Sequence, residues 1–301
     1  MTALTANFIT DNGVTMIDGL ATGVLLFVIA LGLSLVFGVM DVLNLAHGAI
    51  YLVGAYVAVA LIGGGSTMTL VAFGGAVLLA ALIGGIGGWG LSAMVRPVAH
   101  RGHLDQALLT LGIALVVSDL VSMRFGNDVR SIPAPQGLDG SVTIFGQSYP
   151  LYRLVVIVVG ALLAVAALYV IERTRVGSLV RASVVDPQMV SALGVDTKRL
   201  VTGVFAVGAA LAAAGGVIGG PILSAYPGLD NRILLLGLVV VVIGGLGSVS
   251  GALVGALVIG QIETLGVSLL PDHASFLVFG AMGLVLLLRP QGLLGTKEAA
   301  A

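Results

Sequence analysis

The sequence predicts an all-α protein, a polytopic bundle of transmembrane helices. Hydrophobic residues make up 58% of the 301 residues and charged residues only 9%, whereas about a quarter of the residues in an average soluble domain are charged. The mean hydropathy is +1.15, and apolar runs recur along the whole chain. No segment is left for a separate soluble domain, so residues 1–301 are expected to form a single membrane domain.

Apolar segments of spanning length set the expected number of helices. A hydrocarbon core of about 30 Å takes about 20 helical residues, and irregular backbone facing lipid would leave polar groups unpaired. The pattern predicts about nine spans and is compatible with eight to ten. The segments are 14–38, 44–63, 69–95, 104–123, 151–171, 200–222, 232–247, 250–270 and 274–289.

The placement of Lys and Arg predicts the orientation, because basic residues in short loops tend to stay in the cytoplasm. If the spans alternate, Arg96 and Arg101 share one side with the basic residues of 173–199 and with Arg289 and Lys297. We therefore expect a multi-pass protein of the cell (inner) membrane, with its N-terminus external and its C-terminus cytoplasmic. The basic residues expected on the external side are Arg124, Arg130, Arg153 and Arg232.

Small residues recur at every fourth position within several spans, as at Ala80, Gly84 and Gly88 and again at Gly247, Gly251 and Gly255. Such spacing places the small residues on one helix face, where neighbouring backbones approach closely. The sequence therefore predicts a tightly packed bundle.

Polar residues interrupt the second apolar segment at Asp41, Asn44 and His47. Groups of this kind are costly in a bilayer and usually face a protein interior. The pattern predicts a broken helix near 38–48, and such breaks often border a transporter's substrate path. Asn44, His47, Gly48 and Tyr51 are therefore candidate path residues. In the other interpretation, Asp41 and Asn44 cap a helix and His47 bonds a neighbouring helix.

Glu263 is the deepest carboxylate of the predicted spans. It is a further candidate for the path, with helix pairing as the alternative role.

The loop from Glu172 to Arg199 is too polar to insert into the membrane and too long for a simple turn. Asp186 before Pro187 is typical of a helix N-cap, and Gly194 is typical of a helix C-cap. A short helix is therefore expected at about 187–193. Its partly apolar surface favours either a docking element or a helix lying on lipid headgroups.

Several catalytic and nucleotide-binding motifs are missing from the sequence. No Lys follows a Gly, so there is no P-loop for ATP. The chain has no H-E-x-x-H zinc motif, no G-x-S-x-G nucleophile motif and no cysteine. We therefore expect a protein that is not an enzyme and that binds no metal or cofactor of its own.

Four blocks of the sequence resemble the permease subunits of branched-chain amino-acid ABC importers, specifically the shorter of the two paired permeases. They occur in the family's order along the whole chain. The blocks are GLSLVFGVMDVLNLAHGAIYLVGAY (32–56), RTRVGSLVRASVVDPQMVSALGVD (173–196), GGLGSVSGALVGALVIGQIETLG (244–266) and RPQGLLG (289–295).

The resemblance implies a transport subunit that works with a second related permease, two cytoplasmic ATPase subunits carrying ATP and Mg²⁺, and an external substrate-binding protein. It implies that residues 172–199 form a cytoplasmic coupling loop. The corresponding candidate coupling residues are Arg175, Gly177, Arg181, Asp186, Pro187, Met189, Leu193 and Gly194. The alternatives are a urea or amide importer permease of the same family and a stand-alone channel or secondary transporter.

Overall fold

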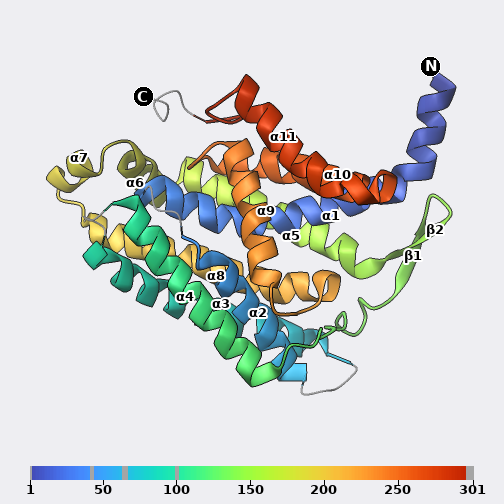
Figure 1. The fold of residues 1–301 in the computed structure, drawn as a ribbon, viewed down its shortest axis with the longest axis horizontal. Coiled ribbons are helices and arrows are strands. Elements are labelled where there is room, and N and C mark those ends of the chain that lie inside the picture. Colours follow the sequence, from blue (N-terminus) through green and yellow to red (C-terminus); the bar gives the residue numbers. More distant parts are fainter. Residues whose placement is uncertain (1, 41–43, 63–66, 99–101, 296–301) are drawn as a thin grey trace.

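The computed structural model describes residues 2–40, 44–62, 67–98 and 102–295. Within these ranges the chain forms an elongated helical bundle (Figure 1). The helices are α1 (Thr2–Met40), α2 (His47–Ile62), α3 (Leu70–Val95), α4 (His103–Phe125), α5 (Leu151–Arg173), α6 (Arg175–Val185), α7 (Pro187–Ala192), α8 (Thr197–Leu223), α9 (Leu229–Gly244), α10 (Val249–Leu269) and α11 (Ala274–Leu288), with 3-10 turns at Arg96–Val98 and Pro271–His273.

The all-α, polytopic architecture is confirmed, whereas the expected count of nine spans is not. Each of the nine expected segments contains a helix, but only 7 helices of the described residues are long and apolar enough to cross a membrane. The exceptions are α2 and α9, which have 16 residues each and therefore a length of about 24 Å. In Figure 1, α9 crosses α1 at a steep angle.

Helix α1 lies at the centre of the bundle and the later helices surround it. In the most apolar 18-residue window of α1, 78% of the residues are buried, against 17% in α5 and 6% in α11. The outer faces of α5 and α11 are apolar and exposed, as expected for helices that contact lipid. Because α1 packs against α5, α8, α9 and α10, it forms one wall of any cavity among these helices.

Small residues bring α3 and α8 into close contact, as the spacing of four predicts. The buried face of α3 carries Ala80, Gly84 and Gly88. An added Cβ at Gly84 or Gly88 would lie only 2.5 Å from a backbone carbonyl oxygen of α8, that of Ala209 or Phe205 respectively. The two backbones therefore touch directly, which supplies van der Waals contact in a lipid environment.

A short antiparallel hairpin joins α4 to α5, an element that the sequence analysis did not predict. Strand β1 (Ser141–Ile144) pairs with β2 (Gln147–Pro150), in the register Ser141↔Pro150 to Ile144↔Gln147. Its two-residue turn has positive φ at both Phe145 and Gly146, as a type I′ turn requires. We call this end of the bundle the hairpin end and the opposite end, where α6 and α7 lie, the α7 end (Figure 1).

The α3–α8 contact predicts different outcomes for adjacent glycines. We expect Gly88→Ala to destabilise the protein by about 1–3 kcal/mol, because the added methyl group must displace the backbone of α8. Gly87→Ala is the matched control, since no atom lies within 4 Å of an added Cβ there. The measurement is the thermal unfolding midpoint of each purified variant in one detergent. Equal midpoints would contradict the packing.

Candidate transport path and coupling segment

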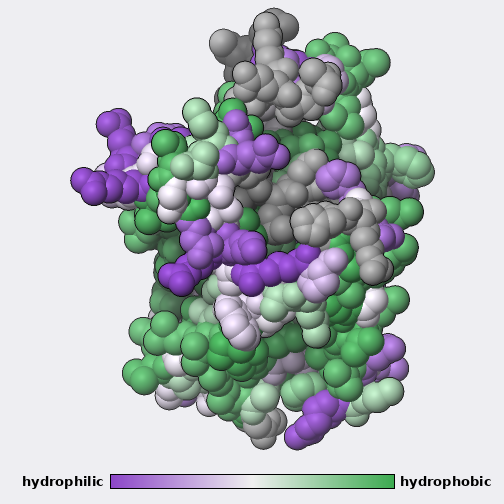
Figure 2. Space-filling view, turned by 90° about the vertical axis from the view of Figure 1, so that its left-hand side faces the viewer, coloured by the Kyte–Doolittle hydropathy of each residue, from purple (hydrophilic) through white to green (hydrophobic). Residues whose placement is uncertain are grey.

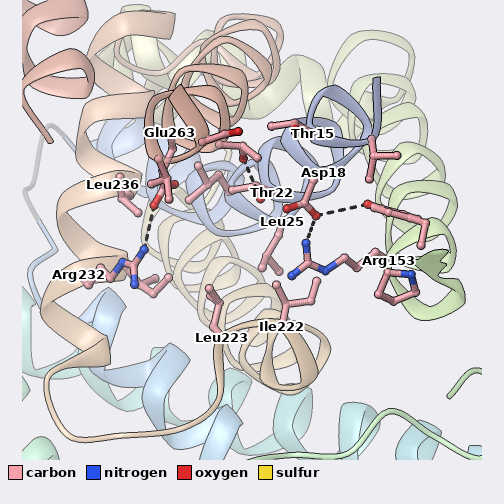
Figure 3. A pocket seen from close by; sticks show the side chains of 18 of the residues that line it. Thr15, Asp18, Thr22, Leu25, Arg153, Ile222, Leu223, Arg232, Leu236 and Glu263 are labelled. Atoms are coloured by element: carbon pink, nitrogen blue, oxygen red, sulfur yellow. Dashed lines mark hydrogen bonds and ion pairs between the residues drawn. The ribbon is translucent and has the colours of Figure 1, made fainter. Parts of the chain in front are cut away.

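A cavity of about 580 Å³ lies toward the hairpin end and is walled by α1, β2, α5, α8, α9 and α10 (Figure 3). Two ion pairs stand on opposite sides of this cavity, Asp18–Arg153 and Arg232–Glu263. Apolar side chains lie between them. The apolar lining residues are Val14, Leu25, Leu26, Pro150, Ile222, Leu223, Ile233, Leu236 and Val267.

The first ion pair ties α1 to the start of α5. The carboxylate of Asp18 accepts from Arg153 Nη1 and, at 3.3 Å, from the hydroxyl of Tyr149 on β2. Burial raises the pKa of Tyr149 to about 12, so its hydroxyl is protonated at neutral pH and donates. Two donors therefore hold one carboxylate, and the hairpin, α5 and α1 form one rigid wall.

The second ion pair joins α9 to α10. Arg232 Nη2 donates to Glu263 Oε1 at 3.0 Å. The Glu263 side chain is 16% exposed and the Arg232 side chain 53%. This pair is thus reachable from the cavity while the carboxylate is largely shielded from bulk water, which strengthens its interaction with a cation relative to the surface.

The predicted path residues of the second segment lie elsewhere, in the packed interior. Asn44 and His47 are each 1% exposed, and Tyr51 is fully buried. The Asn44 Oδ1 atom accepts from the Ala46 amide at 3.1 Å, and His47 Nε2 lies 3.1 Å from the carbonyl oxygen of Ile29 on α1. These contacts match the capping and helix-bonding interpretation.

Gly48 and Tyr51 also serve close packing in this structure. An added Cβ at Gly48 would meet the Asp230 carbonyl, and Tyr51 lies against Gly215 of α8. Glu263 differs from these residues, since it lines the cavity. Contact of Asn44, His47, Gly48 and Tyr51 with a substrate stays a prediction.

The helix break near 38–48 is described in part. Helix α1 ends at Met40 and α2 begins at His47, with a turn at Leu45 and Ala46. Asp41 lies outside the described residues.

Sequence reasoning missed Asp18, Arg153 and Arg232 as partners in a site. Asp18 carried a usable signal, because it is a carboxylate within an otherwise apolar span. For Arg153 and Arg232 the sequence predicts only a position on the external side. Their pairing with carboxylates on other helices depends on tertiary packing, which no local pattern encodes.

The polar segment between α5 and α8 folds into two helices. The short helix expected at 187–193 is α7, which ends one residue earlier, at Ala192. Asp186 Oδ1 accepts from the Met189 amide at 2.8 Å, and Gly194 has a φ of +86°. Both predicted caps are confirmed. Helix α6 was not predicted.

The surface of this segment mixes exposed charge with exposed apolar residues. Met189 is 60% and Leu193 76% exposed, and Arg175 and Arg181 are exposed on α6. Gly177 is buried against the carbonyl groups at the end of α5, so α6 folds back closely on α5. Helices α6 and α7 therefore form a protrusion that packs against α5 at its base, in α6, and carries exposed side chains at its tip, in α7 and Leu193.

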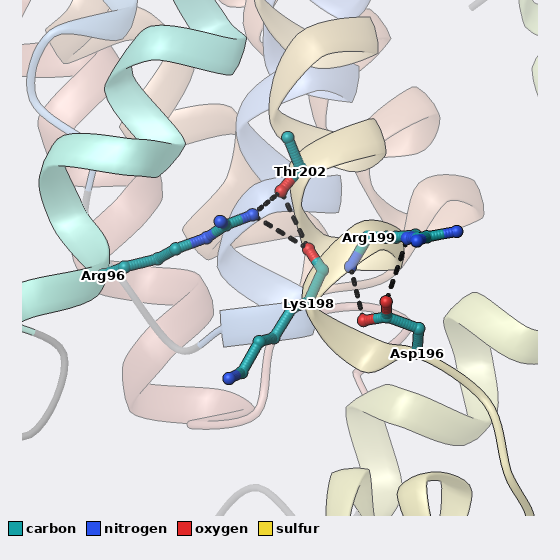
Figure 4. Close-up of polar contacts among 5 residues, drawn as sticks. All are labelled: Arg96, Asp196, Lys198, Arg199 and Thr202. Carbon is teal, nitrogen blue, oxygen red and sulfur yellow. Dashed lines mark hydrogen bonds and ion pairs between the residues drawn. The ribbon is translucent and has the colours of Figure 1, made fainter.

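Polar contacts also join α3 to α8 at the α7 end (Figure 4). Arg96 donates to the Thr202 hydroxyl and, at 3.3 Å, to the Lys198 carbonyl. Asp196 caps α8 through the Arg199 amide at 3.1 Å and pairs with the Arg199 side chain. Hydrophilic residues gather at this end of the molecule, flanked by apolar surface (Figure 2).

Comparison with known proteins gives a consistent family assignment. The family model described as "Branched-chain amino acid transport system / permease component" matches residues 15–287. The LivH permease protein of Salmonella typhimurium is 30% identical over 94% of this chain and 95% of its own length. LivH of Escherichia coli K12 and BraD of Pseudomonas aeruginosa are 29% and 28% identical, each over 94% of this chain and 95% of the relative.

No solved structure matches the chain significantly. The family model nevertheless covers most of the sequence, including all helices from α2 to α10, and the first of these relatives matches at 30% identity over nearly the full length of both chains. The chain therefore belongs to the family of branched-chain amino-acid transport permeases of ABC type.

Proposed function

We propose that this chain is the permease subunit of an ATP-driven importer that moves branched-chain amino acids into the cytoplasm by alternating access. The observation that carries the proposal is the capped, exposed protrusion of α6 and α7. It has apolar residues at its tip, Met189 and Leu193. A subunit of an ATP-driven importer that has no P-loop needs a partner to hydrolyse ATP, and such a tip is suited to insertion into a groove of that partner.

The coupling loop is residues 172–199. Its tip docks on one of two cytoplasmic ATPase subunits, which bind ATP and Mg²⁺ while this chain binds no cofactor. A second homologous permease completes the membrane unit, and an external binding protein delivers the substrate. The Lys and Arg residues gathered at the α7 end support a cytoplasmic position for this end, with the C-terminus cytoplasmic and the N-terminus external.

Two long helices connect the coupling loop with the cavity. Helix α5 begins at Leu151, two residues from the cavity residue Arg153, and ends against α6. Helix α8 begins beside α7, at the cap Asp196, and ends at the cavity residue Leu223. Because each helix is continuous from the loop to the cavity, a displacement of the coupling loop moves two walls of the cavity together.

The first test concerns the docking tip. We expect replacement of residues 187–192 by a Gly/Ser stretch to abolish ATP-driven uptake while membrane insertion persists, because the capped helix that fits the ATPase is lost. Co-purification of the ATPase subunits and uptake of labelled L-leucine by proteoliposomes measure the two effects. Normal association and uptake in this variant would refute the coupling role.

A single substitution sharpens this test. Met189→Asp places a carboxylate at the docking surface and is expected to weaken ATPase association about tenfold or more, since loss of a single hot-spot contact at the centre of an interface costs about 2 kcal/mol or more. Val129→Asp is the matched control, because Val129 is similarly exposed, at 67% against 60%, but follows α4 at the opposite end. It is expected to leave association unchanged.

Uptake in liposomes by this chain alone would favour a channel or secondary transporter instead.

The second test concerns the candidate path residues at and just before the start of α2. The chain has no native cysteine, so His47→Cys and Asn44→Cys each introduce a unique thiol. Because both positions are 1% exposed, we expect slow reaction with a water-soluble thiol reagent in the resting complex and faster reaction during ATP-driven transport. Ala252→Cys, at a fully buried position of α10, is the control that stays protected. Complete protection of positions 44 and 47 in every transport state would contradict their place on the path.

A further inference from the structure

Four residues of α9 and α10 line two cavities at once. Arg232, Leu236, Glu263 and Val267 border the cavity of about 580 Å³ and also a second one of about 320 Å³ that reaches α11. We call these residues the α9–α10 quartet. The quartet forms the partition between the two cavities, so a molecule entering either cavity meets the same side chains.

The spacing within the quartet is the same on both helices. Arg232 and Leu236 are four residues apart on α9, and Glu263 and Val267 are four apart on α10. Residues at this spacing share one helix face. Each helix therefore presents one charged group and, one turn away, one apolar group to the cavities.

We propose that the α9–α10 quartet binds a free α-amino acid with an aliphatic side chain, with the ligand carboxylate on Arg232 and its ammonium group on Glu263. The proposal rests on the proposed function and assigns to this chain a substrate contact of its own. Leu236 and Val267 receive the aliphatic side chain.

The charges of the quartet match those of an α-amino acid. The ligand carries opposite charges on adjacent groups of one carbon, and the quartet offers opposite charges 3.0 Å apart, at Arg232 Nη2 and Glu263 Oε1. A lone anion or a lone cation can interact favourably with only one member of this ion pair, whereas an α-amino acid can interact with both. The site therefore favours a zwitterion over a ligand with a single charge.

Both charged groups have unused hydrogen-bonding capacity. A guanidinium group carries five N–H donors, and the Arg232 side chain is half exposed. The Glu263 Oε2 atom is buried and has no hydrogen-bond partner among the described residues. A rotation of the carboxyl group brings this oxygen toward an ammonium donor, which relieves an unfavourable unpaired polar atom.

The other ion pair of the large cavity differs in this respect. The Asp18 carboxylate already accepts from both Arg153 and Tyr149. Both contacts end on Asp18 Oδ1 and join α1 to β2 and α5, so this pair holds the wall in place. The Asp18–Arg153 pair thus holds a wall of the cavity, whereas the Arg232–Glu263 pair belongs to the binding face.

The apolar surroundings of the quartet fit a branched aliphatic side chain. Ile233 and Leu223 line the large cavity beside Leu236, and Phe279 and Val278 line the second cavity beside Val267. Binding sites for small molecules commonly combine such apolar walls with a few convergent polar groups.

The test is direct binding of tritiated L-leucine to the complete membrane complex in lipid nanodiscs, without the external binding protein. The competitors are 4-methylpentanoate, which lacks the ammonium group, and 3-methylbutylamine, which lacks the carboxylate. In the wild type, each competitor is expected to bind more weakly than leucine, by about tenfold or more, because each lacks one of the two charged groups that form hydrogen bonds.

Each variant is expected to remove one of these two preferences and to keep the other. In Glu263→Gln the weaker binding of 4-methylpentanoate relative to leucine is expected to disappear, while that of 3-methylbutylamine remains. Arg232→Gln is expected to show the converse. The ratio of the affinities for two ligands is measured within one variant, so it does not depend on the fraction of active protein. If Arg232→Gln does not assemble, Arg232→Lys carries the test, with weaker leucine binding and the wild-type ranking expected.

Matched controls and a transport assay separate the possible outcomes. Arg124→Gln and Asp128→Asn change exposed charges that line neither cavity and are expected to bind as the wild type does. Absence of saturable leucine binding, or wild-type ranking in both Gln variants, would overturn the proposal. If the complete importer still takes up leucine, only this inference fails; if it takes up no branched-chain amino acid, the proposed function fails.

Discussion

Close backbone contact around α8 is the constraint on which the rest of the structure depends. Gly84 and Gly88 of α3 approach one side of α8, Gly32 of α1 approaches a second at Gly208, and Tyr51 of α2 lies against Gly215. Apolar burial drives little association between helices in lipid, so contact area and fit must hold them together. Larger side chains at these positions would separate the helices and shift α1 and α8, which form two walls of the cavity.

The placement of the charged residues follows from the same lipid environment. A charged group in an apolar bundle is costly unless it is paired or reaches water. The basic residues of the α7 end reach water, whereas Asp18, Arg153, Arg232 and Glu263 are paired across helices at the cavity. This separation gives the molecule two polar regions, one at the α7 end and one at the cavity.

Two long helices connect the two regions. Helices α5 and α8 each run from the polar segment 172–199 to the cavity wall, and α6 lies closely against α5 at Gly177. Capping by Asp186 and Asp196 fixes the helices on either side of Gly194.

The sequence by itself determined the features that depend on local pattern. These are the helical bundle, the nine helical segments, the small-residue faces and the caps of α7, because periodicity, composition and capping act over a few residues. Only the tertiary structure decided that Asn44 and His47 lie in packed interior, that Glu263 meets Arg232 and that Asp18 meets Arg153. Those partners are 31 and 135 residues apart in the sequence. Their meeting depends on how whole helices pack, and helix packing is a property of the complete fold.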